Sequence, residues 1–416
     1  MTAYELIKAR FIEPFYEKKM GNVGVELEFP LLNMNKKPVD INVAVGCLDF
    51  FCENGFYTEE KSLDGKNAFV TNAYGDTLSF DNSYNNFEFA MNYGNSLTDI
   101  AQRFYGYYEK ASAYFSKYNY LLAGMGTNPY KKYINQAHVD FPVYNMVDEF
   151  LHSFPARHSF PDFPAYLSSV QTHLDLPISD LPRAASLFAR LDFVRAALFS
   201  NAIAWDGKEV LCYRDYLWEN SAFPNTGKVD ESFETTDDII KSFLFRKMFN
   251  CIRNGNYITF TPVIVKDHFD GSNDNDIMQF LSFRNVEITA RGTLEIRSDC
   301  AQPVYEAFIP PAFSLGILYN MGKTQALLED LEPHTKTSKL RDDVINGRLS
   351  LPVKVVLPFV EAAYNGLVIR GKGEEKLLLP LFERAEKSVC PARQTLDKLH
   401  NGHSIDSIII DYSSFG

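Results

Sequence analysis

The stretch Gly24-Val25-Glu26-Leu27-Glu28-Phe29 decides how this chain of 416 residues is interpreted. Apolar and acidic residues alternate in it, which predicts a β-strand that we expect to end at Pro30. Side chains alternate between faces along a strand, so the apolar residues would face a core and Glu26 and Glu28 the opposite side. Two carboxylates about 7 Å apart would then share one face. A half-buried strand with solvated acids would give the same pattern, so the interpretation depends on what other stretches add.

Three later regions repeat this arrangement of core residues on one face and polar residues on the other. Residues 78–81 and 86–89 predict a hairpin or bulge that brings two acids together. Residues 168–176 alternate and predict a strand, and residues 293–297 predict another. Taken singly, each also fits a solvated surface or a surface ion pair of little energetic value. The polar side chains expected on the shared faces are Asp81, Glu88, Gln171, His173, Asp175, Glu295 and Arg297.

If these strands lie in one sheet, at least five carboxylates crowd one face. Such crowding is unfavourable unless cations neutralise it. Hard divalent ions with oxygen ligands are the natural solution, so the pattern predicts Mg²⁺ or Mn²⁺. An arginine beside a metal cluster indicates phosphate chemistry, because metals bridge phosphate oxygens and arginine stabilises the transferring group.

Composition restricts the partners and the compartment. The formal net charge is −12, which argues against nucleic acid and anionic membranes, since both reward clustered Lys and Arg. The six cysteines form no CxxC or zinc pattern and predict buried thiols of a reducing compartment. No apolar run has the length of a signal-peptide core at the N-terminus, or the roughly 20 residues of a membrane span elsewhere. We therefore expect a cytoplasmic protein, a monomer or homodimer, that acts on small molecules.

The order of predicted elements indicates an α+β fold. Strands scattered among helices without a regular βαβ rhythm favour a mainly antiparallel or mixed sheet. Strand signals nearly vanish after residue 320, so we expect a catalytic core over 1–320 and a mostly helical part over 321–416 packed on it. Expected helices span 4–19, 97–118 and 180–200, further strands lie at 257–265 and within 283–297, and acidic loops lie at 228–238 and 270–276.

Seven stretches in order resemble the glutamate–cysteine ligase family of the plant and proteobacterial type, relatives of glutamine synthetase. They lie between about residues 20 and 320, and their order makes the resemblance more specific than any one of them. Residues 24–28 look like the family's G-x-E-x-E strand, 78–89 like LEPGGQFEL, 123–129 like GxGxxP, 169–175 like TVQVNLD, 212–227 like SxRxxIW…RTG, 293–299 like YLEMRGAD, and 311–319 like PAFWVGLLYD.

The resemblance implies a glutamine synthetase-like core, with a curved and mainly antiparallel sheet flanked by helices. It also implies an ATP-dependent ligase that forms γ-glutamylcysteine. Glutamate's side-chain carboxylate would accept the γ-phosphoryl group of ATP, and the amine of cysteine would then displace phosphate from the acyl phosphate. By the same resemblance, Glu26, Glu28, Asp81, Glu88, Glu295 and, more weakly, Gln171 would hold Mg²⁺ or Mn²⁺.

The resemblance also implies roles for the cationic side chains of the site. Arg297 would contact the phosphates of ATP and, with Glu295, act in catalysis. His173 would contact the nucleotide or its phosphates. Arg214 and Arg291 are candidates for substrate carboxylates, because the guanidinium fork matches a carboxylate. A structural ion pair is an equally good interpretation for either arginine.

Departures from the family pattern lie around the substrate-facing loops. The glycine-rich EPGG stretch is Asp81-Asn-Ser-Tyr-Asn here, the arginine of RTG is Asn225, and the asparagine of TVQVNLD is His173. A specialised ligase that joins glutamate or another amino acid to a different amine is therefore an alternative. A carbohydrate-active hydrolase with paired carboxylates is a more distant one, and an inactive ligand-binding relative is the last.

Overall fold

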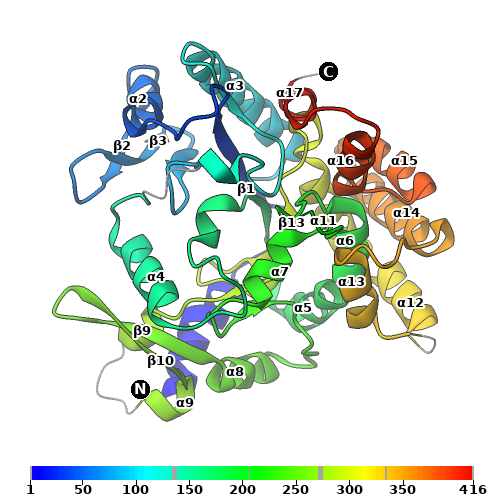
Figure 1. The fold of residues 1–416 in the computed structure, drawn as a ribbon. Helices are drawn as coiled ribbons and strands as arrows, with labels where there is room; N and C mark the ends of the chain where they lie inside the picture. The colour runs from blue at the N-terminus through cyan, green and yellow to red at the C-terminus, as the bar shows by residue number, and fades with distance from the viewer. Residues whose placement is uncertain (1, 134–137, 206, 270–274, 333–334, 415–416) are drawn as a thin grey trace.

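One open antiparallel sheet organises the molecule (Figure 1). The computed structural model describes residues 2–133, 138–205, 207–269, 275–332 and 335–414. Within these residues the sheet has nine strands in the order β12-β13-β7-β1-β5-β4-β3-β2, with β6 also paired to β1. Its strands are β1 (Val23–Asn33), β2 (Phe56–Lys61), β3 (Asn67–Asn72), β4 (Thr77–Phe80), β5 (Asn86–Gly94), β6 (Tyr120–Leu122), β7 (Ser169–Leu174), β12 (Val286–Ile288) and β13 (Leu294–Cys300).

Helices and two small sheets surround this sheet, so the predicted α+β fold is confirmed. In Figure 1 the C-terminal helices lie on one side of the molecule and the β9–β10 hairpin on the other. The small sheets are β9 (Lys247–Arg253) with β10 (Asn256–Ile264), and β8 (Thr226–Gly227) with β11 (Phe283–Arg284). The helices of the first 320 residues are α1 (Ala3–Ile7), α2 (Ile41–Cys52), α3 (Leu97–Ser116), α4 (Pro142–Ser153), α5 (Leu181–Arg190), α6 (Asp192–Phe199), α7 (Tyr213–Glu219), α8 (Thr236–Phe245), α9 (Val265–His268), α10 (Asn275–Met278) and α11 (Ile309–Tyr319).

The pairing register of β1 places the polar residues side by side. Glu28 lies opposite Glu88 on β5, and Glu26 lies opposite Gln171 on β7. His173, further along β7, lies opposite Glu295 on β13. The polar side chains of all four predicted stretches therefore lie on one face of the sheet, as the alternation along each strand predicts.

Aromatic residues fill the opposite face of the sheet. Phe29, Phe87 and Phe89 are completely buried, and their rings pack against Phe104 and Phe115 of α3 or against one another. Ser96 caps α3 by accepting the N–H of Asp99. The predicted helix over 97–118 is confirmed, and much of the aromatic excess of the sequence lies in the core.

The prediction that the first strand ends at Pro30 is wrong, because β1 continues to Asn33. The oxygen of Pro30 accepts the N–H of Ala123, and the N–H of Leu31 bonds to Asn85 on the β5 side. The N–H that proline lacks would face Ala123, which lies opposite Pro30 directly after β6. The Ala123 oxygen accepts the N–H of Met125 at 2.9 Å instead, so no acceptor is left unpaired and the strand continues through the proline.

Three expected elements are subdivided in the structure. The expected helix over 4–19 is α1 followed by a π-helical turn, Lys8–Ile12, and a 3₁₀ turn, Glu13–Phe15, since Pro14 cannot donate to the helical ladder. The helix expected over 180–200 breaks at Leu191 into α5 and α6. Residues 283–297 contain β11, β12 and the start of β13, and the expected loop at 270–276 lies mostly outside the described residues.

Helices dominate the chain after residue 320, as predicted. They are α12 (Met321–Leu331), α13 (Thr337–Ile345), α14 (Val353–Arg370), α15 (Leu379–Lys387), α16 (Pro391–His400) and α17 (Ile405–Ser413). Helix α14 lies against α11 so closely that a Cβ on Gly366 would fall 1.9 Å from the oxygen of Gly316. The division of the chain at residue 320 stays a prediction. Among the described helices, none combines the length and the apolar character needed to cross a bilayer.

Candidate active site

Glu28 is the most firmly held carboxylate of the polar sheet face. Its Oε1 accepts the Ser169 hydroxyl at 2.9 Å and the Gln171 side-chain amide at 2.7 Å. Its Oε2 accepts the Ser169 backbone N–H at 2.8 Å and the Asn86 side-chain amide at 3.4 Å. The side chain is buried, and these four hydrogen bonds fix its position. Sequence reasoning found Glu28 and Gln171 but missed Ser169 and Asn86, because nothing in their spacing marks them.

Asp81 and Glu88 form the second part of the cluster, at the end of the β4–β5 hairpin. Burial and the charge of Glu28 raise the pKa of Asp81 to about 7, despite the opposing effect of Arg297. Burial and the charges of Glu26 and Asp81 raise the pKa of Glu88 well above its usual range. The Tyr144 hydroxyl, which the sequence did not single out, bonds to Asp81. Charge repulsion of this size is what a bound cation relieves.

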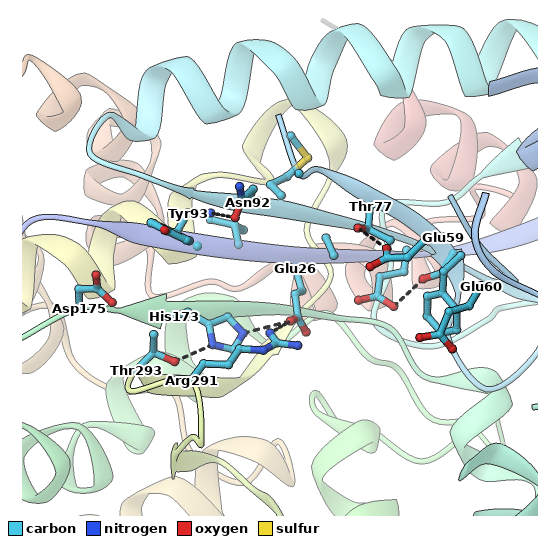
Figure 2. Close-up of a pocket in the computed structure, with 18 of the residues that line it drawn as sticks. Glu26, Glu59, Glu60, Thr77, Asn92, Tyr93, His173, Asp175, Arg291 and Thr293 are labelled. Carbon is cyan, nitrogen blue, oxygen red and sulfur yellow. Dashed lines mark hydrogen bonds and ion pairs between the residues drawn. The ribbon is translucent and has the colours of Figure 1, made fainter. Parts of the chain in front are cut away.

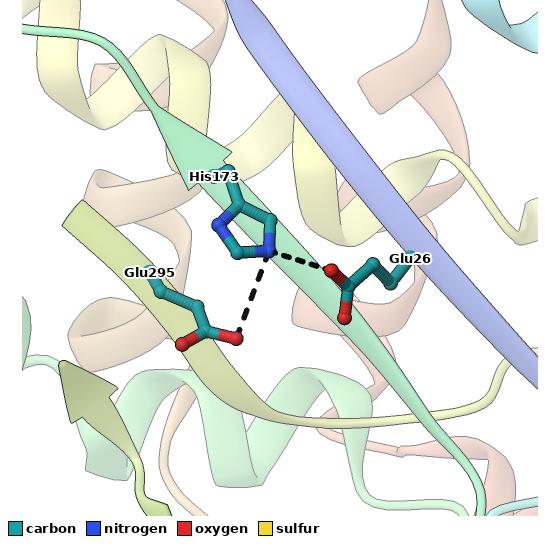
Figure 3. Close-up of side chains that lie close together, drawn as sticks. All are labelled: Glu26, His173 and Glu295. Atoms are coloured by element: carbon teal, nitrogen blue, oxygen red, sulfur yellow. Dashed lines mark hydrogen bonds and ion pairs between the residues drawn. The ribbon is translucent and has the colours of Figure 1, made fainter. Parts of the chain in front are cut away.

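Glu26, His173 and Glu295 form a second group, shown in Figure 3, whose ligand atoms lie within 4.8 Å of one another. His173 Nε2 lies 3.1 Å from Glu26 Oε1 and 3.7 Å from Glu295 Oε1. Burial alone would raise the pKa of Glu26, but His173, Arg291 and Arg297 outweigh it and lower that pKa to about 2. Burial lowers the pKa of His173, yet Glu26 and Glu295 more than offset this, so the pKa is raised.

The other ring nitrogen of His173 has its own partner. Nδ1 lies 3.1 Å from the hydroxyl of Thr293, which in turn lies 2.7 Å from the hydroxyl of Thr289. A histidine oriented in this way through one nitrogen presents the other to a metal. The nucleotide contact expected for His173 stays a prediction, and its place beside Glu26 and Glu295 also makes it a candidate metal ligand. The sequence signal for such a role was that His173 lies on the same strand face as the acidic residues.

Arg297 lies among these acids rather than at the surface. Its guanidinium donates to Glu295 Oε1 at 2.6 Å. Burial lowers the pKa of Arg297, but the charges of Glu295, Glu26, Glu28 and Asp81 raise it further than burial lowers it. Arg297 is therefore a fixed positive charge beside the carboxylates.

A cavity of about 550 Å³ opens on the His173 side of the cluster, and Figure 2 shows it. Glu26 and Glu88 line it with His173, and Arg291 reaches across to Glu26 Oε1 at 3.2 Å. The Arg291 side chain is 74% exposed, so it can move to meet a ligand. Asp175, which follows β7, lines the same cavity and binds Lys18 at 2.9 Å.

A smaller cavity of about 200 Å³ lies on the Glu28 side. Glu26 and Glu88 line this one too, so the two cavities meet at the carboxylates. Arg214 and Arg297 line it as well. Arg214 makes a long contact of 3.4 Å with Asp215. The structure thus separates the two arginines expected to hold carboxylates, with Arg214 in this cavity and Arg291 in the larger one.

The donor set fits divalent metal ions. Five carboxylates converge here, the pKa values of Asp81 and Glu88 are raised, and oxygen donors suit Mg²⁺ and Mn²⁺. The side-chain oxygen of Gln171 is buried and has no hydrogen-bond partner among the described residues. Buried polar atoms are rarely left without a partner, so this oxygen is consistent with the predicted weaker ligand.

The curated proteins whose sequences resemble this chain include plant glutamate–cysteine ligases. No protein-family model matches the chain. It is 26% identical over 265 residues to the chloroplastic glutamate–cysteine ligase of Solanum lycopersicum, and 25% identical to that of Nicotiana tabacum. This chain is similar to glutamate–cysteine ligases. Each match covers 58% of this chain and 51% of the relative, so the chain spans about half the length of the curated relatives it matches.

Solved structures extend the similarity to the fold of nearly the whole chain. The glutamate–cysteine ligase of Francisella tularensis, solved in complex with AMP, matches 95% of this chain and 88% of its own, with a TM-score of 0.51 and 12% identity. A bifunctional glutathione synthetase from Pasteurella multocida matches 99% of this chain and 54% of its own, with a TM-score of 0.54 and 12% identity. The predicted resemblance and its fold are confirmed, while the site roles stay predictions.

Proposed function

We propose that this chain is an ATP-dependent carboxylate–amine ligase that forms an amide through an acyl phosphate. One observation carries the proposal: the carboxylate cluster and Arg297 lie where two cavities meet. A phosphoryl donor bound in one cavity would contact a substrate carboxylate bound in the other. They would meet at the clustered carboxylates that we expect to bind metal. The similarity to glutamate–cysteine ligases supports glutamate as the donor acid.

The larger cavity suits the nucleotide. Its volume of about 550 Å³ lies in the range of small-molecule and cofactor sites. Arg291 and His173 stand on that side, so we assign Arg291 to the phosphates rather than to a substrate carboxylate. Arg214 on the other side would bind the α-carboxylate of glutamate, since a guanidinium matches a carboxylate bidentately.

The metal ligands fall into two sets in this proposal. Glu28, Asp81 and Glu88, with Gln171, would hold one Mg²⁺ or Mn²⁺, and Glu26, His173 and Glu295 would hold another. When bound, such ions neutralise phosphate charge and polarise the transferring group. Arg297 holds positive charge beside Glu295, where the transferring phosphoryl group gains negative charge.

The reaction balances without a protein nucleophile. The side-chain carboxylate of glutamate attacks the γ-phosphorus, a C–O–P bond forms, and ADP leaves. The neutral amine then attacks the acyl carbon, the C–N bond forms, and the C–O bond to phosphate breaks. Inorganic phosphate departs, and the proton lost by the amine passes to phosphate or water.

A panel of acceptors tests the proposal. Phosphate release from ATP with Mg²⁺ and glutamate is measured with cysteine, other amino acids and simple amines, and products are weighed by mass spectrometry. We expect phosphate release that depends on an acceptor and an amide product of matching mass. If no acceptor in the panel causes phosphate release, the ligase proposal is refuted. Cleavage of glycosides without ATP would instead favour the hydrolase alternative.

A further inference from the structure

The smaller cavity has one charged side and one apolar side. The carboxylates and the two arginines form the first. Val143 and Val147 of α4, with Leu167, Trp218, Leu281 and Phe283, contribute to the second. The Trp218 ring is stacked on Phe283 at 4.7 Å between centroids, which fixes part of this wall.

The cations available to substrate carboxylates are few. Among the described residues, Arg214 and Arg297 are the cationic side chains that line the smaller cavity. The residues outside the described ranges include no Lys or Arg. Arg297 is bonded to Glu295 and is assigned to phosphoryl transfer. Arg214 is the arginine that remains for a substrate carboxylate in this cavity, and one guanidinium pairs with one carboxylate.

Asn225 supports the apolar wall instead of adding a cation. Its side-chain amide donates to the backbone oxygens of Lys247 at 2.5 Å and of Leu281 at 3.2 Å. It therefore holds in place the segment that carries Leu281 and Phe283. Asn225 itself lines a different cavity, so it contributes no group to the smaller one.

We infer that the acceptor is a compact primary amine with an apolar substituent and no carboxylate. The inference rests on the proposed function. In that proposal glutamate's α-carboxylate occupies Arg214, and Arg297 and the metal ions hold the phosphoryl group. A second α-carboxylate would therefore be buried beside the acids with no arginine or lysine of its own. Burying an unpaired charge is strongly unfavourable. An alkyl or aryl group instead matches the wall of Val147, Leu281 and Phe283. Glutamate shares this cavity of about 200 Å³, which restricts the acceptor to small amines.

Matched pairs of acceptors test this inference, because each pair differs only by a carboxylate. The pairs are cysteine with cysteamine, valine with isobutylamine, and phenylalanine with phenethylamine, each assayed with ATP, Mg²⁺ and glutamate. We expect kcat/KM at least tenfold higher for the amine of the preferred pair. A higher value for the amino acid in that pair would overturn the inference and leave the ligase intact. Absence of phosphate release with these six acceptors and with the wider acceptor panel would refute the ligase and, with it, this inference.

Adding a cation to the apolar wall gives the converse test. Leu281 is partly exposed, so Leu281→Arg can place a guanidinium near the cavity without burying it fully. We expect this variant to raise the ratio of cysteine to cysteamine turnover at least fivefold, whereas the uncharged Leu281→Gln leaves that ratio below twofold. An unchanged ratio in a folded Leu281→Arg enzyme would contradict the inference.

Discussion

Gln171 donates its side-chain amide to Glu28 across 2.7 Å and leaves its own carbonyl oxygen buried without a hydrogen-bond partner among the described residues. The two ends of one amide therefore have different roles. The nitrogen fixes the carboxylate, and the oxygen is left for a ligand. Because β7 and β1 are neighbouring strands, the backbone holds this pair in place before any metal binds.

Replacing Gln171 by methionine should weaken metal binding. The variant keeps a side chain of similar size but loses both the donor to Glu28 and the free oxygen. We expect the Mg²⁺ concentration for half-maximal phosphate release to rise 10- to 100-fold, the range typical when a support for a metal ligand is lost. Titration of Mn²⁺ by electron paramagnetic resonance gives the same affinity without turnover. Gln102→Met, on the exposed side of α3, is the matched control and should change neither value.

Removing one carboxylate from the Glu26–His173–Glu295 group should abolish turnover and preserve the fold. In Glu26→Gln or Glu295→Gln one metal ligand loses its charge, and we expect phosphate release to fall at least 100-fold. The metal-free variants should stay folded but melt at a lower temperature, because Glu26 loses its ion pairs with His173 and Arg291 and Glu295 loses its pair with Arg297. Glu109→Gln, on exposed α3 surface, controls for loss of an acid elsewhere. Full activity in either site variant would disprove its assigned role.

Stabilisation by Mg²⁺ should increase with pH. In the metal-free protein the pKa of Asp81 is raised to about 7, while an unfolded aspartate titrates near about 4. Between these values the folded state holds a proton that the unfolded state has released, so metal-free stability falls as pH rises through this window. Mg²⁺ must displace that proton, so its affinity should improve up to about tenfold per pH unit below pH 7.

Thermal unfolding at pH 6 and pH 8, with and without Mg²⁺, measures this linkage. The rise in melting temperature caused by Mg²⁺ should be larger at pH 8. Asp81→Asn should stabilise the metal-free protein at pH 8 and flatten the pH dependence, with Glu88 accounting for what remains. An equal effect of Mg²⁺ at both pH values would argue against a proton held by the cluster.

Alternation predicted the polar sheet face because strand geometry is local. Glu26, Glu28, Glu88 and Glu295 each lie within a strand whose pattern fixes the face of every side chain. Cavities depend instead on how distant segments pack, and no local sequence pattern predicts that Tyr144 of α4 bonds to Asp81. The same limit explains Arg214 and Arg291, which the sequence grouped by residue type and the fold places in different cavities.

Helix boundaries depended on details that periodicity does not encode. Pro30 does not end β1, because the oxygen of Ala123 that its missing N–H would face accepts the N–H of Met125 instead. Pro14, in contrast, lies where a helical donor was needed, and the helix ends in 3₁₀ geometry. The same residue type thus ended one element and not the other.

The contact of α11 with α14 predicts that the two parts of the chain unfold together. A Cβ at position 366 would lie 1.9 Å from the oxygen of Gly316, and both partners are backbone that cannot move aside. We expect Gly366→Ala to lower the free energy of unfolding by about 3 kcal/mol or more. Gly106→Ala in α3 has no atom within 4 Å of the new methyl and should be neutral or stabilise by up to about 1 kcal/mol. Two separate transitions in urea would favour independent domains instead.

Arg341 of α13 should matter for substrate binding although it lies behind the cavity. It is 1% exposed and bonds to Asp215 at 2.5 Å and Glu219 at 2.8 Å, and Asp215 in turn contacts Arg214. Arg341→Met would leave these acids without their cation and free Asp215 to pull Arg214 from the cavity. We expect a loss of about 3–5 kcal/mol in stability, as for a broken buried pair. The KM for glutamate should rise at least fivefold, while kcat changes less.

A matched surface variant distinguishes this positioning role from general damage. Arg348 is 61% exposed and pairs with Asp343, so Arg348→Met should cost less than about 1 kcal/mol and leave the KM for glutamate unchanged. In Arg341→Lys the charge returns without the guanidinium fork, which should restore part of the stability and less of the KM. If Arg341→Met lowers stability but leaves the KM for glutamate as in the parent, Arg341 supports the fold alone. Arg214 would then be oriented by other contacts.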